Sequence, residues 1–120
     1  MKSKSLWGIV ILIFLSVSLP VSSDGGDIKV TIKEWEVPTP NSRPHDPAVD
    51  PEGSLWYTGQ LVNVLGRLDP RTGKIREYPL MVPDSGPHGL VSDKEGNIWF
   101  TANYKGYIGK LNPSSGVVTE

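Results

Sequence analysis

Two histidines are the residues of this sequence best suited to chemistry, and they occupy equivalent places in two copies of one motif. His45 follows an Arg-Pro pair and His88 follows a Gly-Pro pair, and the 120-residue sequence contains no other histidine. An imidazole titrates near neutral pH, so it can act as a general base or bind a ligand or a metal. Asp46 could orient the ring of His45, but Gly89 follows His88. This difference argues against a repeated acid–histidine pair.

We take His45, His88 and Asp46 as candidate ligand-binding residues, and the sequence alone identifies no set of metal ligands. The alternative is structural: each imidazole would bond backbone groups of adjacent repeats, and would recur because the geometry recurs. Catalytic residues stay unknown, because the sequence lacks a His-Glu-x-x-His helix motif, a phosphate-binding glycine loop, a Gly-x-Ser-x-Gly elbow and a calcium loop.

The elements that position these residues come from an internal repeat. Pro44–Glu77 aligns with Pro87–Glu120 at a constant offset of 43 positions and without a gap. A fixed period of this size indicates a solenoid, a propeller or an array of repeats. Proline and glycine interrupt each copy, and no apolar stripe of helical period occurs, so a helical repeat is excluded.

Each copy divides into four short strands separated by turns. The second strand, Leu55–Thr58 or Ile98–Thr101, is apolar, aromatic or β-branched throughout, which predicts burial on both faces. Its tryptophan is expected to pack between repeats. The third strand contains a glycine, Gly66 in the first copy, which predicts the close approach of a large ring, with the neighbouring tryptophan as the expected one. Acidic residues at the first turn are expected to cap it: Asp50, Glu52, Asp93 and Glu95.

Four antiparallel strands in a repeat of this length predict an all-β fold made of β-propeller blades. The expected organisation is a first blade over residues 44–80 and a truncated second blade over residues 87–120, within a propeller segment that spans 24–120. Residues 28–38 match only the fourth strand and are expected to close the last blade of the ring. We interpret the chain as an N-terminal fragment of about two blades; a small independent β-domain is the weaker alternative.

Residues 1–23 have the features of a secretory signal peptide. Two lysines precede an apolar run from Leu6 to Leu15, and small residues lead to an expected cleavage after Ser23. A membrane anchor is less favoured, since the run is shorter than the roughly 20 apolar residues that a span needs. The sequence therefore predicts a secreted or periplasmic protein with no membrane attachment after cleavage.

The numbers of basic and acidic residues limit the kinds of partner that we expect. The chain has 12 basic and 13 acidic groups, and no basic stripe that would neutralise phosphates, so nucleic acid is not an expected partner. The partners we expect are a small-molecule or peptide ligand at the propeller mouth and the rest of the same ring.

The repeat resembles the virginiamycin B lyase (streptogramin lyase) family. The resemblance covers Ile32 to Glu120 and rests on a Pro-His start, a Gly-x-Leu/Ile-Trp-Tyr/Phe-Thr core, and a Gly-Arg/Lys-Leu-Asp/Asn-Pro-x-x-Gly turn. It implies a seven-bladed propeller with carbon–oxygen lyase activity: a general base removes a proton beside an ester carbonyl, and β-elimination opens a cyclic depsipeptide antibiotic. It also implies an assisting Mg²⁺ ion, with no ligands identifiable here.

The resemblance implies no catalytic residue for this chain. The family's catalytic histidines and glutamate belong to the last blades, and its antibiotic-inactivating members need not be exported. The leading hypothesis is therefore an exported streptogramin-lyase-like propeller whose fragment alone is inactive. A non-catalytic exported binding or scaffold module is the alternative, and a metal-dependent lactonase-type propeller is a weaker one, because Asp46 would be its sole inner-strand carboxylate.

Overall fold

The computed structural model describes residues 29–120. The expected signal peptide, residues 1–23, lies outside this range. The chain divides into two units, Met1–Ile32 and Lys33–Glu120, and all the strands of the described residues belong to the second unit. Residues 29–32, at the end of the first unit, form no helix or strand. Within the described part of the chain, no helix is long and apolar enough to cross a membrane.

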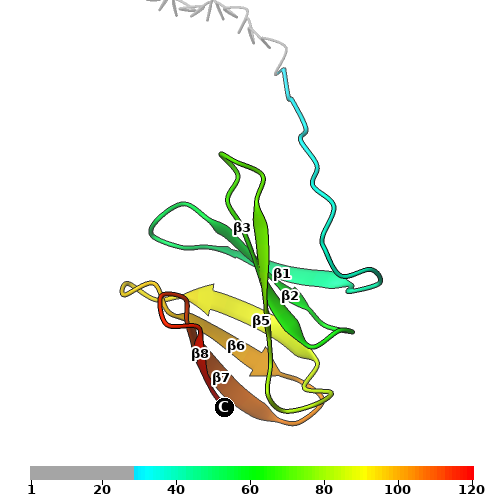
Figure 1. The fold of residues 1–120 in the computed structure, drawn as a ribbon, viewed down its shortest axis with the longest axis vertical. Helices are drawn as coiled ribbons and strands as arrows, with labels where there is room; N and C mark the ends of the chain where they lie inside the picture. The colour runs from blue at the N-terminus through cyan, green and yellow to red at the C-terminus, as the bar shows by residue number, and fades with distance from the viewer. Residues whose placement is uncertain (1–28) are drawn as a thin grey trace, which may run out of the picture. The chain divides into compact units, whose positions relative to one another are not determined.

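Eight strands form two four-stranded antiparallel sheets, which confirms the predicted fold class (Figure 1). Sequential strands are hydrogen-bonded neighbours in both sheets, in the orders β1-β2-β3-β4 and β5-β6-β7-β8. The first sheet consists of β1 (Pro44–Val49), β2 (Leu55–Gly59), β3 (Val64–Leu68) and β4 (Ile75–Pro79). The second consists of β5 (Pro87–Ser92), β6 (Ile98–Ala102), β7 (Tyr107–Asn112) and β8 (Val117–Thr119).

The strand expected over residues 28–38 is not formed among the described residues 29–38. A strand needs a hydrogen-bonded partner, and none of the eight strands pairs with this segment. Side-chain contacts with the first sheet and its turn occur instead: the Trp35 ring lies beside Gly73, and just after the segment the Thr39 hydroxyl donates to the Glu77 carboxylate. Its part in closing a ring stays a prediction.

The core lies between the two sheets. One face of the first sheet presents Trp56, Leu65 and Tyr78, and the Trp56 and Tyr78 rings stack with their centroids 5.5 Å apart. The second sheet meets this face with side chains that are all at most 2% exposed: Ile98, Phe100, Ala102 and Leu111. The sheets therefore pack through non-equivalent faces, which is a head-to-tail arrangement.

The face that is buried in the first sheet is exposed in the second. Trp56 is fully buried, whereas its counterpart Trp99 is 39% exposed, and Leu65 is fully buried whereas its counterpart Ile108 is 67% exposed. The prediction of burial on both faces is therefore right for β2 and wrong for β6, which alternates between buried and exposed. In β6 the face of Ile98 and Phe100 packs against the first sheet, while Trp99 and Thr101 on the other face are exposed. In β2 the face away from the second sheet is buried as well, and there the Tyr57 hydroxyl donates to the Glu77 carboxylate.

The ring beside each strand glycine is not the one that we predicted. A Cβ on Gly66 would overlap the Tyr57 ring, and a Cβ on Gly109 would overlap the Phe100 ring. Tyr57 and Gly66 are directly opposite in the β2–β3 register, as are Phe100 and Gly109 in β6–β7. Directly opposite residues share one face of a sheet, so the ring lies over the glycine while the tryptophan points to the other face.

The first turn of each repeat is built on an aspartate, as predicted. The Asp50 carboxylate accepts hydrogen bonds from the Ser54 backbone (2.9 Å) and the Trp56 indole (2.8 Å), and it lies 3.2 Å from Arg67. Asp93 repeats this pattern with Trp99 (2.9 Å). Hydrogen bonds from the Trp99 indole and from Asn97 hold the pKa of Asp93 below its usual value. Each aspartate thus fixes the tryptophan of its own repeat, and in the first repeat the second sheet covers that tryptophan.

We expect a polypeptide of residues 24–120 to self-associate through the exposed face of the second sheet. Exposed apolar side chains on a sheet face favour association, and a head-to-tail contact does not close after two copies. Trp99→Lys or Ile108→Lys should shift the molecular mass in light scattering toward that of the monomer. Leu61→Lys, which removes a 58%-exposed apolar side chain from a turn, should not. A wild-type polypeptide that is monomeric at high concentration would contradict this expectation.

We expect Gly66→Ala to destabilise the protein by about 1–3 kcal/mol through overpacking against Tyr57. The cost should fall when Tyr57→Leu removes the ring, so chemical denaturation of the double variant should show coupling between the two sites. Gly109→Ala serves as the matched control, because its overlap is with Phe100 and Tyr57→Leu should not relieve it. Additive effects of Gly66→Ala and Tyr57→Leu would argue against a steric origin.

Candidate functional site

The chain enters β1 and β5 through the same unusual backbone conformation. Arg43 (φ 50°) and Gly86 (φ 59°) hold equivalent positions in the repeat, and both have left-handed backbones. An L-residue pays a steric cost there that glycine avoids. The histidine follows two residues later in each copy, so the turn that places His88 is formed by a glycine and the turn that places His45 by a strained arginine.

A β-bulge then re-aims the side chains at the start of each inner strand. The β1–β2 register shifts between His45 and Ala48, and the β5–β6 register shifts between Pro87 and Leu90. Successive side chains of a regular strand point to opposite faces, and a bulge interrupts that alternation. The side chains of His45 and Asp46 consequently lie together, with His45 Nδ1 2.8 Å from Asp46 Oδ1.

Asp46 faces both histidines. Its second carboxylate oxygen, Oδ2, lies 3.5 Å from His88 Nδ1. The two imidazole rings are 3.9 Å apart between centroids and tilted by 41°. All three side chains are partly exposed, by 31% for His45, 45% for Asp46 and 35% for His88. One carboxylate between two imidazoles, open to solvent, is an arrangement that suits a cation or a hydrogen-bonding ligand.

Thr58 connects the two strands that carry this cluster. It is fully buried on β2, directly opposite His45 in the β1–β2 register. Its hydroxyl donates a 3.0 Å hydrogen bond to the backbone carbonyl of His88. β5 packs against both β1 and β2. The position of His88 relative to His45 is therefore set by a buried side chain at the joint between the sheets.

The structure brings together all three residues that the sequence singled out. Both histidine Nδ1 atoms face Asp46, and among residues 29–120 neither imidazole hydrogen-bonds a backbone group. The repeat alignment disfavours an acid–histidine pair in each copy, because Gly89 replaces aspartate in the second. One aspartate shared between the copies is a different arrangement, and only the packing of β1 beside β5 produces it.

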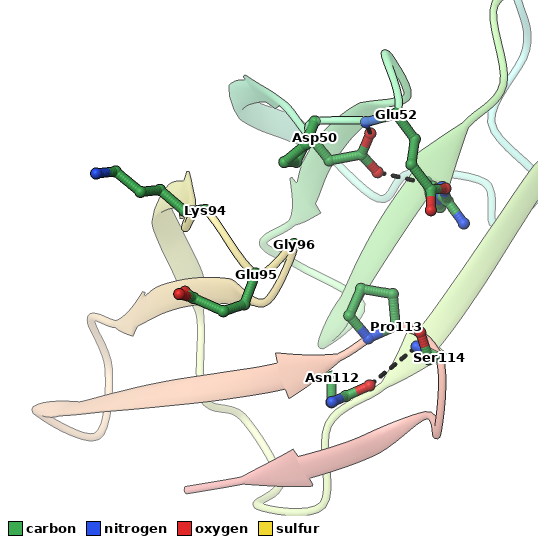
Figure 2. Close-up of a pocket in the computed structure, with 10 residues that line it drawn as sticks. Asp50, Glu52, Lys94, Glu95, Gly96, Asn112, Pro113 and Ser114 are labelled. Atoms are coloured by element: carbon green, nitrogen blue, oxygen red, sulfur yellow. Dashed lines mark hydrogen bonds and ion pairs between the residues drawn. The ribbon is translucent and has the colours of Figure 1, made fainter.

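A hollow of about 170 Å³ lies at the opposite end of β1 from the histidine cluster, between the turns of the two sheets (Figure 2). Three of its charged groups are paired with one another, since Arg67 lies 2.6 Å from Glu52 and 3.2 Å from Asp50. Burial alone would lower the pKa of Arg67, but the hydrogen bond to Glu52 and the charge of Asp50 raise it. The side chains of Lys94 and Glu95 extend away from these carboxylates. This hollow is a structural ion-pair site.

The residues described here do not fit Mg²⁺, the ion that the sequence resemblance implies. Mg²⁺ is bound by oxygen ligands in octahedral geometry. The cluster of His45, Asp46 and His88 is the one group of three or more potential metal-binding side chains in the described part of the chain. It offers two nitrogen donors and a single carboxylate, a donor set that suits zinc-like transition metals better.

Comparison with known proteins gives a consistent result. The model of the Virginiamycin B lyase family matches residues 25–120. A solved streptogramin B lyase structure matches at 40% identity with a TM-score of 0.70, over 74% of this chain and 29% of that chain. Selenomethionine-substituted virginiamycin B lyase from Staphylococcus aureus matches at 32% identity with a TM-score of 0.69, over 74% and 30%.

A third similar structure is a catalytically inactive histidine-to-alanine variant of the S. aureus virginiamycin B lyase with quinupristin. It matches at 30% identity with a TM-score of 0.69, over 74% of this chain and 30% of that chain. The search of curated proteins found no significant match. The chain spans about 30% of the length of the solved structures that it resembles. The match of the family model over nearly all of residues 24–120, together with these shared blades, places the chain in the virginiamycin B lyase family.

Proposed function

We propose that the protein is an exported carbon–oxygen lyase that opens a cyclic depsipeptide antibiotic of the streptogramin type by β-elimination. A base removes the proton beside the ester carbonyl, the bond between the β-carbon and the ester oxygen breaks, and the products are a carboxylate and a carbon–carbon double bond. The ring opens without the addition of water, which separates this reaction from ester hydrolysis.

One observation carries the proposal: the chain is 40% identical to a streptogramin B lyase over 74% of its own length. The S. aureus relative that is inactivated by a histidine-to-alanine change, and that was solved with quinupristin, supports histidine chemistry on such a ligand in that protein. Identity of this size over two blades supports a common ring architecture, while activity depends on particular side chains of the site.

The described residues would contribute to the scaffold of such a site. His45, Asp46 and His88 lie where two blades meet, and their polar side chains are partly open to solvent. The Mg²⁺ ion that the resemblance implies has no suitable oxygen-ligand set among residues 29–120. We therefore assign the base and the magnesium site to parts of the complete ring other than these two blades.

We expect the full-length protein to convert a cyclic streptogramin B depsipeptide, in the presence of Mg²⁺, into a linear product of unchanged mass. β-Elimination yields an isomer of the substrate, so liquid chromatography with fragmentation mass spectrometry detects it as a new peak. A product heavier by one water molecule would indicate a lactonase-type hydrolase instead. An intact substrate beside an active control lyase would contradict the lyase proposal and favour a binding module.

We expect export to remove residues 1–23. Protein recovered from the periplasm or medium of a bacterial host should begin at Asp24, as read from its intact mass. Leu12→Arg, which interrupts the apolar run, should leave the uncleaved precursor in the cells. A full-length Met1 form in the exported fraction, or a cleaved form with the Leu12→Arg change, would argue against a signal peptide.

A further inference from the structure

We propose that His45, Asp46 and His88 form a binding site for a zinc-class divalent metal ion that ties the first two blades together. This inference concerns a site that the proposed lyase activity does not use. Its ligands are His45 Nδ1, His88 Nδ1 and one carboxylate oxygen of Asp46, and the metal-binding atoms of the three residues all lie within 4.8 Å of one another.

The observed geometry needs only small side-chain adjustments to hold such an ion. Zn²⁺ binds imidazole nitrogen and carboxylate oxygen at about 2.0–2.2 Å, usually in a tetrahedron, which separates the ligand atoms by about 3.3 Å. Asp46 Oδ1 already lies 2.8 Å from His45 Nδ1, and Asp46 Oδ2 lies 3.5 Å from His88 Nδ1. All three side chains are partly exposed, so water can occupy the fourth position.

The donor set predicts which ion binds. Two imidazole nitrogens and one carboxylate suit Zn²⁺, Co²⁺ and Ni²⁺, whereas Mg²⁺ requires mostly oxygen ligands and holds its own water tightly. The single carboxylate gives the site a negative charge when both imidazoles are neutral, which favours a cation. The site should therefore discriminate strongly against the magnesium ion that the family resemblance implies.

Two features of the fold hold the three ligand residues close to one another before any metal binds. The β1 bulge turns His45 and Asp46 to the same side, and the buried Thr58 hydroxyl fixes the His88 backbone at 3.0 Å. A metal bound here would join β1 of one sheet to β5 of the other. Because binding occurs only when the sheets are packed, it would stabilise their interface.

The experiment titrates ZnCl₂, and in parallel MgCl₂, into the protein produced without a polyhistidine tag. We expect one Zn²⁺ to bind per chain by calorimetry and to raise the thermal unfolding temperature, with no comparable effect of Mg²⁺. His45→Ala, His88→Ala and Asp46→Asn should each weaken Zn²⁺ binding by about tenfold or more. Glu95→Gln is the matched control: it removes a carboxylate elsewhere and should leave binding unchanged.

A wild-type measurement keeps the test independent of how well the variants fold. The sequence has two histidines and no cysteine, so nitrogen NMR of the imidazoles in this chain reports on this site alone. Zn²⁺ should shift both Nδ1 resonances at one equivalent. Absence of Zn²⁺ binding, unshifted Nδ1 resonances, or equal affinity for Mg²⁺ would overturn the proposal. Since none of these readouts involves depsipeptide cleavage, failure of the lyase assay would not decide the outcome.

Discussion

The structure depends on the burial of one sheet face against the opposite face of the next sheet. Trp56, Leu65 and Tyr78 of the first sheet are covered by Ile98, Phe100 and their neighbours in the second. The contact joins unlike faces, so the second sheet, which is covered on one face, exposes on its other face Trp99 and Ile108, the counterparts of Trp56 and Leu65. Burial of a tryptophan and several aliphatic side chains contributes several kcal/mol at about 25 cal/mol per Å² of apolar surface. A single repeat would therefore leave the apolar face of Trp56 and Leu65 uncovered.

The histidine cluster is a product of this same contact. β1 and β5 begin equivalent repeats, and stacking the sheets brings their first residues side by side. The rings of His45 and His88 then come within 3.9 Å between centroids. Their proximity follows from the joint that buries Thr58, so the geometry of the cluster and the integrity of the core are linked. A shared carboxylate partly offsets the cost of placing two polar rings at this joint.

Much of the fold could be predicted from the sequence, because period, turn residues and β-branched or aromatic runs are local signals. The eight strands and their turns follow from them. Two inferences failed because they depend on relations beyond a single strand. Tyr57, and not Trp56, lies over Gly66, and Trp99 is exposed where Trp56 is buried. The first outcome depends on the register between β2 and β3, and the second depends on which face of each sheet is covered. The alternation of residues within one strand specifies neither.

The candidate site also depends on a contact between repeats that the sequence alone does not predict. The sequence identified each of its three residues as a candidate. It did not predict the contact between Asp46 and His88, because these residues belong to different repeats. A comparison of repeats aligns each residue with its own counterpart, so the change from Asp46 to Gly89 reads as a lost pair. In the structure the change has another consequence. The Gly89 backbone amide donates to the Thr101 hydroxyl at 2.8 Å, in a position where a Cβ would lie close to that same hydroxyl. At this position the second repeat has no aspartate, and its histidine faces Asp46 of the first repeat instead. The two repeats therefore share one fold but contribute different side chains to the cluster.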